Sequence, residues 1–133
     1  MLVDAGPLVA LFRGSQEHDE ICRLMLHELR PPLLTCWPVI TEAAYLLRGR
    51  PNEVRALLES FPGGFLQLVP LDASDILGIQ AILDQYQDQG FQLADACLMY
   101  LAEREKVDCV FTLDRRDFSV FRTARGAALT VLP

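Results

Sequence analysis

Four acidic residues stand in contexts where a carboxylate needs an explanation. Asp4 follows a short apolar run in VDAGPLVALF, and Glu42 lies within PVITEAAYLL. Asp95 interrupts the apolar segment FQLADACLMYLA, and Asp114 follows the β-branched and aromatic run of VFTLDRRDF. A carboxylate among apolar side chains is costly to bury unless it is paired or binds a metal ion. If the fold gathers these four side chains, they form an acidic cluster suited to metal-assisted chemistry.

Each of these acids also has an ordinary structural explanation. Asp4 can cap the helix that follows it, and Glu42 can lie at the solvated end of its helix. Asp95 can complement a helix dipole in a first turn, and Asp114 is a residue type that turns favour. Asp117 is either a local cap or a further acid of the same site. Because aspartate is unfavourable inside helices, the apolar surroundings of Asp95 favour a functional role.

The elements that must position these acids alternate between strands and helices. Strands are expected at 1–4, 33–36, 65–69, 107–111 and 128–132. Helices are expected at 8–13, 38–47, 52–61 and 93–105, with one more capped by Ser15 and another capped by Asp72 or Ser74. The run at 107–111 has the clearest strand pattern, and a turn is expected after it.

This alternation predicts an α/β fold, a three-layer sandwich with a central, mostly parallel sheet flanked by helices. Ligands bind such sheets at the carboxyl ends of the strands, near the point where strand order reverses. The four acids all follow strands or lie early in the next helices, so they map to this edge. No repeat or linker stands out, and we expect residues 1–133 to form a single domain.

Four carboxylates in one cleft repel one another, and divalent cations are their natural counter-charge. All-oxygen ligation suits Mg²⁺ or Mn²⁺ and disfavours zinc, and the sequence has no cluster of Cys and His. Two such ions about 3.5–4 Å apart could stabilise the attacking and leaving oxygens in phosphodiester cleavage. The acids alone are therefore compatible with a metal-dependent phosphodiesterase.

Composition limits the other function classes. The chain has 18 acidic and 12 basic residues and a net charge of −6, which argues against binding nucleic acid through a broad basic surface. No apolar run approaches the ~20 residues of a membrane span, and the first residues lack the basic region of a secretory signal. The 4 cysteines form no CxxC pair and have apolar neighbours, which predicts buried thiols in a cytoplasmic protein.

Four segments, LVDAGPLVALF, ITEAAYLL, LADACLMYLAE and VFTLDRRDF, together resemble the PIN domain, and more narrowly the VapC-type toxins of bacterial and archaeal toxin–antitoxin pairs. The resemblance extends over essentially the whole chain, and LADACL followed by TLDRRDF is its most specific part. It implies a parallel sheet sandwiched by helices and metal-dependent endoribonuclease activity. It also implies an RNA substrate, a cognate antitoxin and a homodimer.

Carried over by motif, the resemblance assigns the catalytic and metal-binding acids as Asp4, Glu42, Asp95 and Asp114, with Asp117 as a further metal ligand. Thr112 matches a small hydroxyl residue that can hydrogen-bond a carboxylate or a water at the site. Many relatives carry Ser or Thr within two residues of the first Asp, where this sequence has Ala5 and Gly6. That departure puts one hydroxyl contact in doubt, although the backbone of Gly6 could approach closely instead.

Arg115 and Arg116 flank Asp114 and are candidates for contacts with the RNA backbone, with solvated turn residues as the alternative. Arg13, at the end of the first helix, is a weaker candidate of the same kind. The competing function is a catalytically inactive PIN-like module that binds a partner or acts as a scaffold. The presence of all four core acids favours the enzyme. Receiver-like phosphotransfer is disfavoured because the only lysine, Lys106, precedes its strand.

Overall fold

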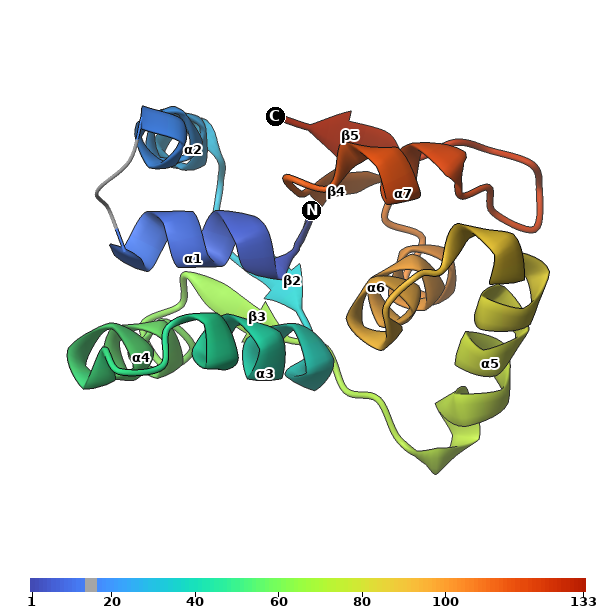
Figure 1. Ribbon diagram of the computed structural model, residues 1–133, viewed down its shortest axis with the longest axis horizontal. Helices are drawn as coiled ribbons and strands as arrows, with labels where there is room; N and C mark the ends of the chain where they lie inside the picture. Colours follow the sequence, from blue (N-terminus) through green and yellow to red (C-terminus); the bar gives the residue numbers. More distant parts are fainter. Residues whose placement is uncertain (14–16) are drawn as a thin grey trace.

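Five short strands form one sheet at the centre of the protein. A computed structural model describes residues 1–13 and 17–133 (Figure 1). The strands are β1 (Leu2–Val3), β2 (Leu33–Thr35), β3 (Leu66–Leu68), β4 (Cys109–Phe111) and β5 (Thr130–Leu132). They pair in parallel in the order β3-β2-β1-β4-β5. Each strand lies within a predicted extended run, and the parallel sheet is confirmed.

Helices fill the connections between the strands. They are α1 (Ala5–Arg13), α2 (Glu17–Glu28), α3 (Trp37–Leu46), α4 (Pro51–Glu59), α5 (Ile76–Gln85), α6 (Leu93–Arg104) and α7 (Arg115–Val120). In Figure 1, α1 to α4 gather on the left of the view and α5 to α7 on the right. The chain adds strands in one direction from β1 to β3 and then crosses back to form β4 on the other side of β1. Because parallel crossovers are right-handed, this reversal puts α5 and α6 on the opposite face of the sheet. The predicted three-layer sandwich is confirmed.

Local signals in the sequence explain where α5 begins and why the chain breaks before α6. The Asp72 carboxylate accepts a hydrogen bond from the Ser74 backbone N–H at 2.8 Å, and the Asp75 carboxylate accepts one from the Asp72 N–H at 2.8 Å. This capping box opens the 3₁₀ turn η1 (Ala73–Asp75), which leads into α5. After the second 3₁₀ turn, η2 (Gln87–Gln89), Gly90 takes a φ of 66°, which glycine adopts without strain. The other predicted cap, Ser15, lies outside the described residues.

Helix α7 is the element that the sequence pattern did not predict. Only a turn was expected after β4, yet Arg115–Val120 form a helix. Its six residues are too few to show a helical period. The helix is held by tertiary packing instead, because Phe118 within it and Phe121 just beyond it are almost completely buried. This helix places Asp117 beside the end of β4.

The cysteines belong to the structural core. All four are thiols, with Cys22, Cys36 and Cys97 buried and Cys109 half-buried, as predicted from their neighbours. Burial raises the pKa of Cys36 to about 12 and that of Cys97 to about 11, so both stay protonated and unreactive at neutral pH. Within the described residues, no helix has the length and apolar character needed to cross a membrane.

Candidate active site

Strand order reverses at β1, and this fixes the position of two acids. The chain leaves β1 toward β2 and later returns on its other side as β4. Asp4 directly follows β1, and its backbone N–H donates to the carbonyl of Phe111, the last residue of β4, at 2.9 Å. Asp114 comes three residues after that strand end. Both acids therefore lie at the switch point, where open α/β sheets form their ligand crevices.

A cleft of about 450 Å³ opens at this edge of the sheet. Five acids line it, contributed by the ends of β1 and β4 and by three different helices: Asp4, Glu42, Asp95, Asp114 and Asp117. The structure thus brings all five predicted acids to one place. No Lys, Arg or His belongs to the described lining.

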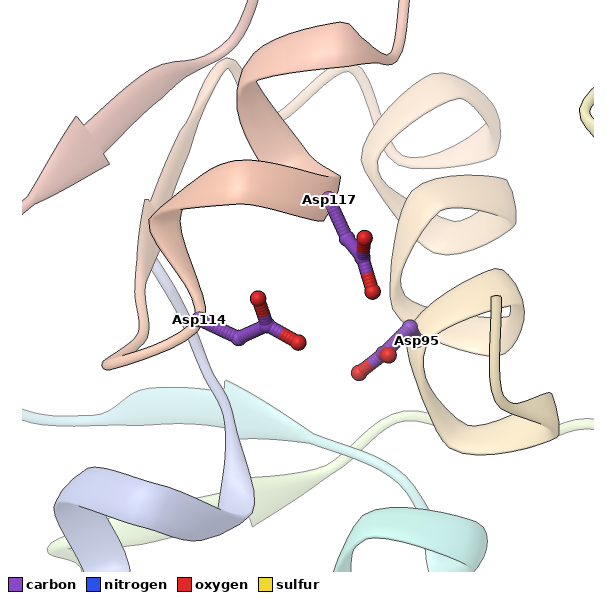
Figure 2. Close-up of side chains that lie close together, drawn as sticks. All are labelled: Asp95, Asp114 and Asp117. Carbon is purple, nitrogen blue, oxygen red and sulfur yellow. The ribbon is translucent and has the colours of Figure 1, made fainter. Parts of the chain in front are cut away.

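Asp95, Asp114 and Asp117 form the tightest part of the cluster. One carboxylate oxygen from each lies within 4.8 Å of the others. Asp95 is buried in the first turn of α6, Asp114 precedes α7 and is exposed, and Asp117 is half-buried in the first turn of α7. Figure 2 shows the three side chains pointing toward one another from these separate elements. This geometry gathers three carboxylates around a space suited to a cation.

Asp4 is held in place by hydrogen bonds to both of its carboxylate oxygens. Its Oδ1 accepts from the backbone N–H of Ala5 at 2.8 Å, and its Oδ2 accepts from the hydroxyl of Thr112 at 2.8 Å. The same hydroxyl oxygen accepts from the backbone N–H of Asp114 at 3.0 Å. Thr112 is fully buried. One hydroxyl therefore fixes both the first acid and the start of the turn that carries Asp114.

Gly6 allows the first helix to approach the segment after β4. A Cβ atom at this position would lie 3.2 Å from the side chain of Leu113. Both residues line the cleft beside Asp4. Gly6 therefore packs closely against Leu113, whereas an approach of its backbone to a bound group stays a prediction. The hydroxyl that contacts Asp4 comes from Thr112, at the other end of the chain, rather than from position 5 or 6.

Burial and mutual repulsion raise the pKa values of the clustered acids. The pKa of Asp95 rises to about 7, chiefly through burial and further through the negative charges of Asp4, Asp114 and Glu42. Burial is likewise the largest cause of the raised pKa of Asp4 and of Glu42. The pKa of Asp117 is raised by burial and by the neighbouring Asp114. The cluster is thus short of positive charge.

A divalent cation fits this set of donors. The acidic side chains offer oxygen ligands of the kind that Mg²⁺ and Mn²⁺ prefer. Burial first, and mutual repulsion second, raise their pKa values, and a bound cation would offset both effects. Asp95, Asp114 and Asp117 are placed to hold one ion, because their oxygens already lie close together. Asp4 and Glu42 face the same cleft.

The three predicted RNA-contacting arginines lie outside the lining of the cleft. The Arg115 guanidinium donates to the backbone carbonyls of Val131, within β5, and of Pro133, just after it. Arg116 is exposed, and its charge opposes the rise in the pKa of Asp117. Arg13 is exposed at the far end of α1 from the cleft. Their contacts with RNA remain predictions.

Four other lining residues were not predicted as part of the site: Leu46, Gly90, Gln92 and Leu113. Leu46 lies one helical turn after Glu42, so helical spacing could have placed it on the same face of α3. Leu113 adjoins Thr112 in the chain. Gln92 directly precedes α6, and a glutamine at such a position does not by itself indicate a site residue.

Clusters of carboxylates hold the metal ions of several classes of phosphoryl-transfer enzyme, nucleases among them. The chain belongs to the PIN domain family, whose profile matches residues 1–124. It is 30% identical over 135 residues to Ribonuclease VapC26 of Mycobacterium tuberculosis, and the alignment covers 100% of each chain. The resemblance read from the four sequence segments is confirmed.

The likeness extends to a solved structure. The crystal structure of VapC20 from Mycobacterium tuberculosis, described as a toxin that cleaves the Sarcin-Ricin loop, matches with a TM-score of 0.78. The match covers 86% of this chain and 90% of that one, at 14% sequence identity. At this level of identity, the comparison establishes the shared fold alone.

Proposed function

We propose that this protein is a metal-dependent endoribonuclease and the toxin of a VapBC-type toxin–antitoxin pair. The observation that carries the proposal is the convergence of five carboxylates on one cleft of a PIN-family chain. The similarity to Ribonuclease VapC26 supports RNA as the substrate. The complete set of acids favours this function over an inactive binding or scaffold module. Residues 1–133 would act as a single nuclease domain in the cytoplasm.

The proposed chemistry is hydrolysis of a phosphodiester bond by water. A bound Mg²⁺ or Mn²⁺ supplies Lewis-acid activation and neutralises developing negative charge. Asp95, Asp114 and Asp117 would hold the cation, and Asp4 and Glu42 line the same cleft. One of these carboxylates accepts the proton of the attacking water. The Thr112 hydroxyl keeps the Asp4 carboxylate in a single orientation.

Removing the metal is expected to abolish RNA cleavage. Among the described residues that line the cleft, no basic side chain could replace the cation, so the carboxylates alone would repel a phosphate. Purified protein should cut RNA in Mg²⁺ or Mn²⁺, lose this activity in excess EDTA, and regain it when Mg²⁺ exceeds the chelator. Gel analysis of RNA fragments measures each step. Full activity in excess EDTA would contradict the proposal.

We further propose that the protein forms a homodimer and binds a small antitoxin encoded beside it. The acidic cleft suits an inserted Arg or Lys side chain, because that charge compensates the carboxylates as a cation does. Protein purified from its native host should carry the product of the adjacent gene. Light scattering should give a mass that contains two copies of this chain. A lone monomer with no such partner would overturn the toxin assignment but leave the nuclease assignment standing.

A further inference from the structure

Gln92 is the one described side chain lining the cleft that can donate a hydrogen bond when the acids are ionised. The other lining residues are the five acids and a set of glycine, alanine and leucine residues. An ionised carboxylate only accepts hydrogen bonds, and the apolar side chains do neither. A bound cation neutralises phosphate but cannot distinguish one nucleotide from another. A base atom that accepts a hydrogen bond from a side chain of the described lining must therefore be read by Gln92.

The side-chain amide of Gln92 is available for this contact. Gln92 occupies the N-cap position of α6, yet its side chain makes no capping hydrogen bond. It is exposed and has no other side-chain hydrogen bond within the part of the chain that the structure describes. Residues of its type seldom cap helices, so the position is not explained by local structure.

The backbone that carries Gln92 is firmly anchored. The preceding residue, Phe91, is buried, and its ring centroid lies 5.2 Å from that of Tyr86. The following residues form the first turn of α6, which carries Asp95 three positions later. Gln92 and Asp95 are therefore about one helical turn apart. A nucleotide whose phosphate meets the acidic cluster would place a neighbouring nucleotide within reach of the amide.

We propose that Gln92 reads the base edge of a nucleotide next to the scissile phosphate and so sets the sequence preference of cleavage; this inference rests on the proposed function. A glutamine amide presents a donor and an acceptor side by side, which matches the donor–acceptor pairs on base edges of unpaired nucleotides. A phosphate offers acceptors only and would leave the amide carbonyl facing negative charge. The amide therefore suits a base better than the backbone.

Gln92→Met tests the inference, because methionine has a similar length but lacks the amide. The matched control is Gln89→Met, at an exposed glutamine in η2 that is not among the lining residues. Each protein is incubated with Mg²⁺ and a pool of short unstructured RNA oligonucleotides that covers all trinucleotides, and the cut ends are sequenced. In Gln92→Met, the preference for one flanking base should fall roughly tenfold. Gln89→Met should keep the wild-type profile, and both should melt as wild type does.

Several outcomes would overturn the inference. An equal drop at every site would mean that Gln92 contacts the backbone, and an unchanged profile would mean that it contacts nothing in the substrate. Gln92→Ala, whose side chain is too short to reach, should reproduce the loss of preference. Failure of the wild-type protein to cut the pool, with Mg²⁺ present, would instead remove the nuclease assignment on which this inference rests.

Discussion

Replacing Asp95 by asparagine is expected to abolish RNA cleavage while the protein stays folded. Burial raises the pKa of Asp95 most, and the charges of the four other clustered acids raise it further, so its charge interacts with each of them. Asparagine keeps the volume and removes the charge. Loss of residues that merely orient metal ligands costs about 10–100-fold in activity, so loss of a ligand should cost at least about 100-fold. Fragment yield from labelled RNA in Mg²⁺ measures the effect.

The same substitution should leave the metal-free protein as stable as wild type, or more stable by about 1 kcal/mol near pH 8, because it removes like-charge repulsion. The pKa of Asp95 is about 7 in the folded protein and 3.8 for an unperturbed aspartate. Between these values the folded state retains a proton that the unfolded chain has lost. Stability of the metal-free wild type therefore falls as pH rises through this window. Asp95→Asn should flatten this slope without removing it, because the pKa of Asp4 is raised as well.

Thermal melting between pH 5 and pH 8, with and without Mg²⁺, checks both parts of this prediction. Wild type should gain more stability from Mg²⁺ than Asp95→Asn does, because binding to the folded state adds to its free energy of unfolding. Asp84→Asn, at an exposed position in α5 outside the cleft lining, is the matched control and should behave as wild type. If Asp95→Asn cleaved RNA as fast as wild type, or were less stable than wild type, the acids would not form a catalytic cluster whose charges repel one another.

Thr112→Val should impair both stability and cleavage. Valine keeps the branched shape but leaves the Asp4 Oδ2 atom without its donor and the Asp114 N–H without its acceptor. Unsatisfied groups of this kind cost about 1–3 kcal/mol in the free energy of unfolding. Because Asp4 loses its fixed orientation, cleavage should fall roughly 10–100-fold. Denaturant unfolding and the RNA assay measure the two effects.

Two further variants separate the hydroxyl from the packing. Thr112→Ser keeps the hydroxyl and should recover most of the cleavage. Thr35→Val is the matched control, since Thr35 is also fully buried but its Oγ1 has no hydrogen-bond partner among the described residues. This change should be neutral or stabilising, because it removes an unsatisfied hydroxyl. If Thr112→Ser were as impaired as Thr112→Val, the hydrogen bonds could not be the cause.

The gathering of the acids at one edge of the sheet could be predicted from the sequence because their signal is local. An isolated carboxylate such as Asp95 in an apolar run is visible in a dozen letters, and strand ends place such residues at one edge of a parallel sheet. Helix α7 was missed because packing of Phe118, not periodicity, holds its six residues. For Thr112, the sequence predicted a hydrogen bond to a carboxylate or a water but not the partners Asp4 and Asp114. Those partners depend on how β1 and β4 pair. Gln92 has no local signal at all.

The pairing of β1 with β4 also governs when the site can exist. Asp4 stands at the start of the chain, whereas Thr112, Asp114 and Asp117 come only after the last third of the sequence has begun. The hydrogen bond from Asp4 to Phe111 joins these distant segments. While the protein is being synthesised, the early strand must wait for its neighbour, so the emerging polypeptide carries no complete acidic cluster. A ribonuclease built in this way cannot cut RNA until both segments have been made and have paired.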